Sequence, residues 1–127
     1  MERRRHTRHR ARLDASLQFS TLVIESELTA EGMRRMLAVA GTTRDLSESG
    51  MALVVPLAQV DEHYLALENC TLQIMLELPD GAIEIEAKPV RYEKVGGDYL
   101  IGAEIIKMAD DDRATLLAYL RTLSVNT

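Results

Sequence analysis

Arginine side chains crowd the start of this chain, and their chemistry suits planar, phosphate-bearing partners. The first twelve residues hold six arginines, one glutamate and no lysine. A guanidinium group is flat and carries a fork of N–H donors, so it binds phosphate through two hydrogen bonds and stacks on rings. This composition favours recognition of a bidentate or planar partner over a role in solubility alone. The arginines are Arg3, Arg4, Arg5, Arg8, Arg10 and Arg12.

A second polar group lies in a predicted turn over residues 45 to 50, with the sequence DLSESG, between two runs of strand-like residues. Asp45 can accept hydrogen bonds, and Ser47 can both donate and accept them. Gly50 allows a turn geometry and a close approach that a side chain would block. If this chain binds a ligand, the turn and the arginines are the candidates. An ordinary turn is the alternative, because Asp, Ser and Gly are common in turns.

The charge is divided unevenly along the chain. Residues 1–12 carry a formal +5, so the remaining 115 residues carry −10 of the overall −5. Six arginines in a short segment repel one another, and we expect residues 1–12 to form a flexible basic arm. A generic basic tail for nucleic acid or anionic surfaces is the alternative interpretation of this arm.

Length and composition predict one domain over residues 13–127. With 127 residues and 46% apolar content, the chain can bury one ordinary core. The single cysteine, Cys70, cannot form an internal disulfide, and no signal-peptide pattern opens the sequence. No apolar run approaches the roughly 20 residues of a membrane-spanning helix. We therefore expect a cytoplasmic protein without a membrane span.

Alternating apolar and polar residues predict several β-strands. The clearest run covers residues 70–78 and is followed by the turn Pro79-Asp80-Gly81, which leads into a partner strand over 82–92. The apolar phase of that partner shifts to Val90 and Tyr92 near Pro89, which predicts a bulge or an edge position. Further strands are expected over 13–20, 37–45, 51–55 and 99–106. Residues 21–36 are expected to form either a long hairpin end or an insertion between strands. Residues 57–69 are expected to form a loop with one helical turn.

The C-terminal segment has helical periodicity. Leu116, Leu120 and Leu123 share one face, with Leu117 alongside, so we predict an amphipathic helix over 110–123. The apolar residues exceed a single stripe, which leaves a contact with a second copy open beside a purely internal role. Short strands, frequent turns and one terminal helix predict an all-β fold, a small antiparallel β-barrel capped by a helix.

The two polar groups together resemble the signature of the PilZ domain family, an RRxxxR arm followed by [DN]xSxxG. The arm supplies Arg3, Arg4 and Arg8, and the turn supplies Asp45, Ser47 and Gly50. The resemblance covers most of the chain. It implies a six-stranded antiparallel β-barrel, and members with both motifs bind the bacterial second messenger cyclic di-GMP.

By this resemblance the six motif residues contact cyclic di-GMP, with Arg4 and Arg8 as the main contacts of the arm. The ligand carries two phosphates and two guanines, which suit arginine forks and an aspartate acceptor. We expect the arm to close on the nucleotide and so to change the surface or oligomeric state that a downstream protein partner recognises. Strand alternation points Arg44 away from Asp45, which leaves Arg44 at best an auxiliary contact. Two alternatives are a PilZ-type interaction module and a basic-arm anion or nucleic-acid binder, neither of which takes the nucleotide.

Catalysis and metal binding find little support in the sequence. Ser47, His63 and an aspartate have the residue types of a triad, but no nucleophile elbow surrounds the serine. The three histidines lack the spacing and second cysteine of a zinc site. Asp110 to Asp112 suit the start of a helix, where carboxylates cap free N–H groups. We expect no enzyme, no catalytic residue, no metal and no cofactor.

Overall fold

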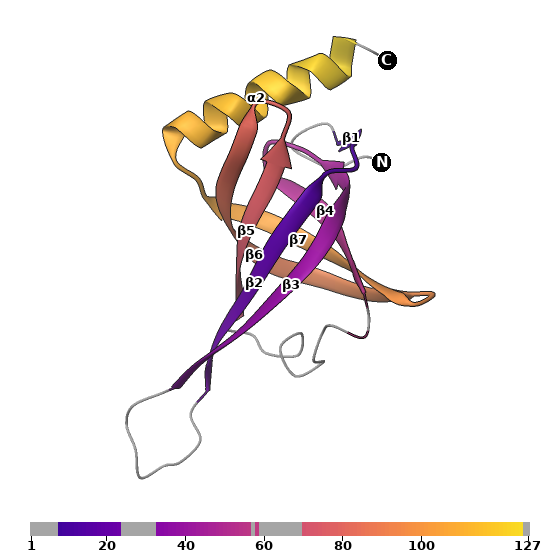
Figure 1. The fold of residues 1–127 in the computed structure, drawn as a ribbon, viewed down its shortest axis with the longest axis vertical. Coiled ribbons are helices and arrows are strands. Elements are labelled where there is room, and N and C mark those ends of the chain that lie inside the picture. Colours follow the sequence, from indigo (N-terminus) through magenta and orange to yellow (C-terminus); the bar gives the residue numbers. More distant parts are fainter. Residues whose placement is uncertain (1–7, 24–32, 57, 59–69, 126–127) are drawn as a thin grey trace.

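The computed structural model describes residues 8–23, 33–56, 58 and 70–125, and in them one antiparallel sheet closes into a barrel (Figure 1). The strand order is β1-β3-β2-β5-β6-β7-β4, and pairing of β3 with β4 completes the ring. The predicted six-stranded barrel with a C-terminal helix is confirmed, with β1 added beside β3. The elements are β1 His9–Arg10, β2 Asp14–Val23, β3 Met33–Leu46, β4 Gly50–Pro56, β5 Thr71–Leu78, β6 Gly81–Val95, β7 Asp98–Lys107 and α2 Asp110–Val125.

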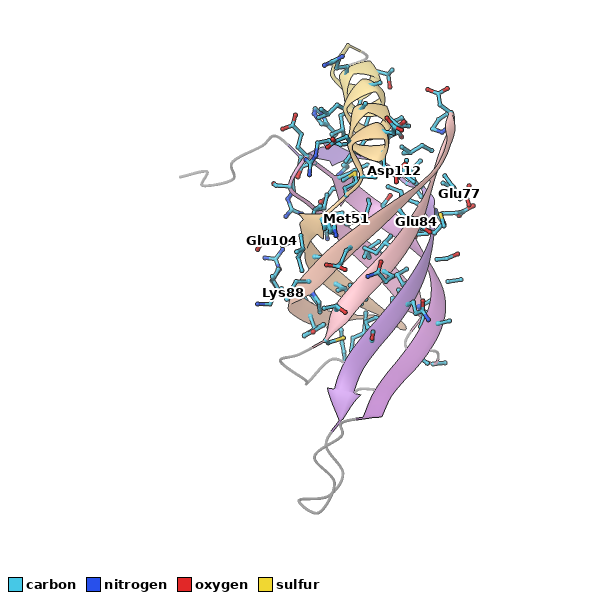
Figure 2. The ribbon with its side chains drawn as sticks, turned by 90° about the vertical axis from the view of Figure 1, so that its left-hand side faces the viewer. Met51, Glu77, Glu84, Lys88, Glu104 and Asp112 are labelled. Carbon is cyan, nitrogen blue, oxygen red and sulfur yellow. The ribbon has the colours of Figure 1, made fainter. Side chains whose placement is uncertain are left out.

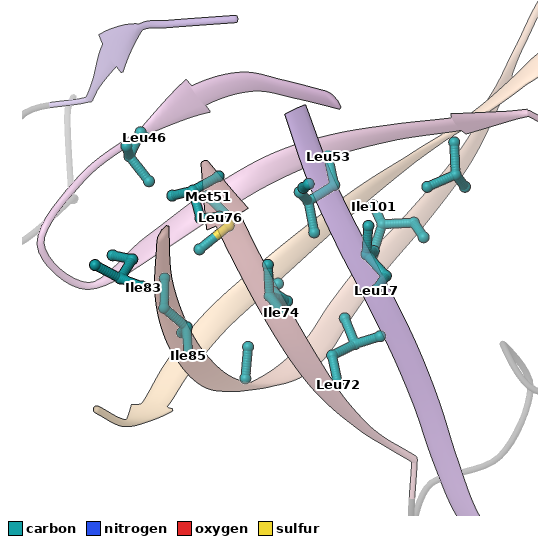
Figure 3. Close-up of a cluster of buried hydrophobic side chains, with 14 of the residues drawn as sticks. Leu17, Leu46, Met51, Leu53, Leu72, Ile74, Leu76, Ile83, Ile85 and Ile101 are labelled. Atoms are coloured by element: carbon teal, nitrogen blue, oxygen red, sulfur yellow. The ribbon is translucent and has the colours of Figure 1, made fainter. Parts of the chain in front are cut away.

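Inward-pointing apolar side chains of the strands fill the inside of the barrel (Figure 3). In β5 the predicted inward residues Leu72, Ile74 and Leu76 are at most 1% exposed, while Gln73 and Glu77 face solvent. Phe19, Leu53 and similar side chains from the other strands meet them in one cluster. Burial of these apolar groups is the main force that holds the barrel closed.

Two glycine turns connect the last three strands, and the first of them is the predicted turn Pro79-Asp80-Gly81. Gly81 has φ +136° and Gly96 has φ +61°, values that side-chain-bearing residues rarely adopt. They allow the reversals from β5 to β6 and from β6 to β7, which form tight hairpins. The predicted strands over 70–78, 82–92 and 99–106 are thus confirmed.

Three β-bulges interrupt the pairing of the barrel. They leave Arg44 of β3, Val90 of β6 and Ile106 of β7 without a cross-strand partner. The bulge predicted near Pro89 is confirmed, but the prediction that Val90 belongs to the apolar phase is wrong. Val90 is 57% exposed because it is the extra residue of the bulge.

The β2–β3 hairpin is long, with backbone pairing as far as Val23 and Met33. This agrees with an extended hairpin end between positions 21 and 36. The connecting residues 24–32 lie outside the described part of the chain, as does the segment predicted as a loop over 57–69, apart from residue 58.

Helix α2 lies across one end of the barrel (Figure 1). Leu116 and Leu120 are buried, and Tyr119 and Leu123 pack against the core from the same helix. Asp112 Oδ2 accepts a hydrogen bond of 3.2 Å from the backbone N–H of Glu84 in β6 (Figure 2), so an aspartate predicted as a cap also ties the helix to the sheet. Among the described helices, none is long and apolar enough to cross a membrane.

Candidate functional site

The end of the basic arm is part of the sheet. His9 and Arg10 form β1 and pair antiparallel with Leu46 and Asp45 of β3. The pairing brings the arm sequence beside the predicted turn, although the two are more than thirty residues apart in the chain. Strand β1 also contacts helix α2, so this end of the arm lies next to both the barrel and the helix (Figure 1).

Thr43 anchors the arm to the barrel. Its side chain is 2% exposed, and its Oγ1 donates to the carbonyl of Ala11 and accepts from the N–H of Leu13 at 2.9 Å. The N–H of Thr43 donates to the carbonyl of Leu13 at 2.9 Å, and the N–H of Ala11 donates to the carbonyl of Arg44 at 3.2 Å. These bonds fix where the chain enters β2 and therefore where Arg8 emerges.

Arg8 and Asp45 join the arm to the turn. Arg8 Nη1 donates to Asp45 Oδ1 at 2.8 Å, and the two side chains are 21% and 13% exposed. A charge-assisted bond of this length in a partly screened position is stronger than a surface ion pair, because less water competes for the charges. The two segments that the sequence singled out therefore meet in the fold.

Arg44 also contacts Asp45, which corrects the prediction from strand alternation. Its Nε and Nη2 lie 3.4 Å from Asp45 Oδ2. Thr43 pairs with Leu53 and Asp45 pairs with Ala52, so Arg44 is the extra residue of a bulge. Alternation fails at a bulge, and both charged side chains reach the outer face while Leu46 turns inward.

Ser47 organises the turn from the inside. It is 1% exposed, and its Oγ accepts from the N–H groups of Ser49 at 3.2 Å and Gly50 at 3.1 Å. The same hydroxyl donates to the carbonyl of Gly50 at 3.1 Å, and the N–H of Ser47 donates to that carbonyl at 2.9 Å. Its hydrogen-bonding capacity is therefore used within the turn.

Gly50 allows the start of β4 to approach β7. A Cβ at this position would lie 2.7 Å from the carbonyl oxygen of Ala103, closer than real contacts permit, and 3.6 Å from Arg8 Nη2. Gly50 is not among the residues with positive φ. The glycine is needed for the close approach of two backbones and not for a left-handed turn.

The predicted site residues fall into two groups. Arg8, Asp45, Ser47 and Gly50 come together, with Arg8 and Asp45 on the outer surface and the other two beneath it. The predicted contacts Arg3 and Arg4 lie outside the described residues.

A row of residues continues from Asp45 around the barrel, and it was not predicted. Cross-strand pairing places Asp45 beside Ala52, Ala52 beside Gly102, and Gly102 beside Arg91. We call the outer surface over these four residues the shelf. Its floor is made of the smallest side chains available, with charged residues at both ends. The sequence signal that could have found Arg91 is the phase shift near Pro89.

The residues of the described segments offer no group of three potential metal ligands. Burial raises the pKa of the Cys70 thiol, so the thiolate form is disfavoured at neutral pH. Burial likewise raises the pKa of Tyr92 to about 12. Both groups face the inside of the barrel, and neither has the environment of an activated nucleophile.

The fold and the paired arm and turn define a β-barrel module that presents charged side chains on the outer surface of its strands. The model of the PilZ domain family matches residues 2–122, and the chain belongs to this family. The resemblance inferred from the two motifs is therefore confirmed. No curated protein is similar enough to count as a match.

Several solved structures share the fold. The inhibitor of motility MotI/DgrA from Bacillus subtilis is 20% identical with a TM-score of 0.70, and the match covers 100% of this chain and 54% of the MotI/DgrA chain. The PilZ domain of YcgR from Escherichia coli, solved with c-di-GMP, is 15% identical with a TM-score of 0.59, and the match covers 98% of this chain and 94% of the YcgR chain. MrkH from K. pneumonia, in a c-di-GMP complex, is 18% identical with a TM-score of 0.63, and the match covers 98% of this chain and 53% of the MrkH chain. The chain thus spans about half the length of MotI/DgrA and MrkH.

Proposed function

We propose that this chain is a receptor for cyclic di-GMP, which binds on the outer face of the barrel between the arm and the turn. The observation that carries the proposal is the 2.8 Å bond between Arg8 and Asp45, which joins the two halves of the sequence signature. YcgR and MrkH, two proteins of the same fold, have been solved with this nucleotide, which supports the choice of ligand.

The residues at the site match the chemistry of the ligand. Arg8 can move from Asp45 to a phosphate or to the O6/N7 edge of guanine, since its fork fits both. Asp45 can then accept hydrogen bonds from guanine N–H groups. Arg44, already 3.4 Å from Asp45, is placed to keep that carboxylate oriented. In the proposal Arg3 and Arg4 complete the phosphate contacts from the arm.

Ser47 and Gly50 have supporting roles in this proposal. Because the Ser47 hydroxyl is buried and fully engaged, it holds the turn that carries Asp45 instead of contacting the ligand through a free donor. Gly50 keeps the floor beneath Arg8 low enough for that guanidinium to lie over it. Both residues position the contact groups of the site.

The signal is a change of surface, and the protein acts without catalysis. Nucleotide binding exchanges the Arg8–Asp45 pair for ligand contacts and draws the rest of the arm onto the barrel. Strand β1 contacts α2, so movement of the arm alters the surface beside the helix. A protein partner, or a second copy of the chain, binds to this altered surface. Sedimentation velocity with and without nucleotide, over a range of protein concentrations, separates these two outputs.

A second candidate function is an interaction module that takes no nucleotide. The observation in its favour is that both carboxylate oxygens of Asp45 already contact arginines, Oδ1 with Arg8 and Oδ2 with Arg44. A carboxylate whose two oxygens are already engaged needs no hydrogen-bond donor from a ligand. Direct binding measurements distinguish the two functions.

Isothermal titration calorimetry with cyclic di-GMP tests the proposal. The wild type is expected to bind, and the Arg4→Ala/Arg8→Ala double variant and Asp45→Asn are expected to lose most of the affinity. Arg121→Ala is the matched control, because it removes an exposed arginine of helix α2 that is not among the proposed contact residues. Absence of binding by the wild type, or wild-type affinity in the double variant, contradicts the proposal and favours the interaction module.

A further inference from the structure

We propose that Arg91 is a further ligand-contacting residue, which meets the nucleotide from the end of the shelf opposite Asp45. The inference rests on the proposed function and names a residue outside both motifs of the signature. It comes from the registers of the strands, from the two bulges and from the position of the Arg91 side chain.

The registers place Arg91 and Asp45 in one row on the same face. Asp45 pairs with Ala52, Ala52 pairs with Gly102, and Gly102 pairs with Arg91. Residues that pair directly across antiparallel strands point to the same side of a sheet. Ala52 is buried yet absent from the core cluster, as expected for a residue that points outward beneath surface side chains.

A bulge is responsible for the outward direction of Arg91. Ile85, Ala87 and Pro89 are buried at alternate positions of β6, so uninterrupted alternation would turn Arg91 inward. The bulge at Val90 shifts the phase by one residue, and Tyr92 takes the inward position instead. The bulge at Arg44 does the same for Asp45 at the other end of the row. Two independent irregularities thus deliver opposite charges to one surface.

The Arg91 side chain folds back along the shelf. A Cβ on Gly102 would lie 3.5 Å from Arg91 Cβ, 3.5 Å from its Nε and 3.8 Å from its Nη2. The guanidinium of Arg91 therefore lies over Gly102 of β7, which is one strand closer to Asp45 than the backbone of Arg91 in β6. Two strand spacings separate Gly102 from Asp45, a gap of roughly 10 Å. That gap can hold a nucleotide base and phosphate between the two charged ends.

The electrostatic surroundings leave Arg91 available for a ligand. Arg91 is exposed, and no ion pair or hydrogen bond joins its guanidinium to another residue of the described segments. Glu93 follows on the same face of β6, and Glu104 and Lys88 form the neighbouring cross-strand pair on this side of the barrel (Figure 2). The carboxylates can accept guanine N–H groups, so the phosphates are directed to Arg91 and Arg8. A flat guanidinium over a glycine also offers a stacking surface for guanine.

Calorimetry with cyclic di-GMP tests this role in the full chain. Arg91→Ala is expected to weaken binding by about ten- to a hundredfold, the range for a lost charge-assisted hydrogen bond. Arg91→Lys keeps the charge but loses the planar fork, so it is also expected to bind several-fold more weakly than wild type. Arg121→Ala is the control, and an unchanged thermal midpoint shows that each variant is folded.

If Arg91→Ala binds as tightly as the wild type while Asp45→Asn loses binding, the role of Arg91 is overturned and the proposed function stays intact. Full affinity in Arg91→Lys overturns the planar contact. A wild type that does not bind the nucleotide overturns both. Amide NMR provides a second measurement, because the signals of Ala52 and Gly102 are expected to shift on titration. Binding without these shifts places the ligand off the shelf and refutes the inference.

Discussion

The two sides of the turn over residues 45–50 serve different purposes. On the outside Asp45 shares its carboxylate with arginines of the arm and of its own strand, where a ligand can compete for it. On the inside Ser47 and Gly50 are buried, where Ser47 satisfies the backbone of the turn and Gly50 lets β4 lie close to β7. A sequence signature can therefore combine contact residues with residues that only hold them. Mutations on the two sides should separate stability from binding.

Gly50→Ala is expected to have the largest effect on stability. The added Cβ would meet the carbonyl of Ala103 at 2.7 Å, and two paired strands must move apart to admit it. We expect a loss of roughly 3 kcal/mol in the free energy of unfolding, measured by urea denaturation. Gly97→Ala is the matched control, because a Cβ there meets nothing within 4 Å. Equal stability of the two variants would contradict the close approach.

Ser47→Ala is expected to cost roughly 2 kcal/mol. The change leaves the buried N–H of Gly50 without its acceptor and removes the acceptor of Ser49 as well. The affinity for cyclic di-GMP should fall only to the extent that the turn becomes less stable, because Ser47 makes no direct contact with the ligand in the proposal. Ser49→Ala serves as control, since its hydroxyl makes a single 3.5 Å contact with Ser47. If Ser47→Ala abolishes binding at full stability, its hydroxyl contacts the ligand directly.

Thr43→Val preserves the shape of a buried side chain and is expected to cost about 1 kcal/mol. It removes the bonds to Ala11 and Leu13 that hold the arm against β3. Hydrogen exchange at the Leu13 amide should become faster while the amides of β5 stay protected. Uniform acceleration of exchange across the barrel would instead show that Thr43 supports the whole core.

Asp45→Asn is expected to change stability least, by less than about 1 kcal/mol, because the amide oxygen of asparagine can still accept hydrogen bonds from the neighbouring arginines. The same change should remove most of the affinity for cyclic di-GMP. Denaturation and calorimetry on one preparation compare the two effects, with Glu77→Gln as the control for loss of an exposed carboxylate. A large loss of stability would place Asp45 with the buried side of the turn.

Much of the fold follows from local rules that the sequence obeys. The alternation along β5 and the turn at Gly81 predict a hairpin, and the structure confirms it. The leucines of α2 likewise predict the face that Leu116 and Leu120 bury. In these segments period and backbone preference agree, so nothing competes with the pattern.

The predictions went wrong or stayed incomplete where a bulge or a long-range contact decides the outcome. The direction of Arg44 and the exposure of Val90 follow from extra residues that alternation cannot place without the partner strand. The burial of Ser47 depends on β7 passing above the turn, where Ile105 donates to the carbonyl of Ser49. Strand β1 has two residues and no periodicity of its own. The meeting of arm and turn was inferred from family resemblance, since no local pattern contains it.

The bulges at Arg44 and Val90 have a consequence for the gene that encodes this chain. Each is one extra residue, so in-frame loss of codon 44 or 90 would restore regular alternation with Asp45 or Arg91 still facing outward. Loss of one codon elsewhere in β3 or β6 would exchange inner and outer faces along the strand and expose the core. The shelf therefore tolerates the loss of a residue at two points where the rest of β3 and β6 does not, and deletions in these two strands among homologous genes should gather there.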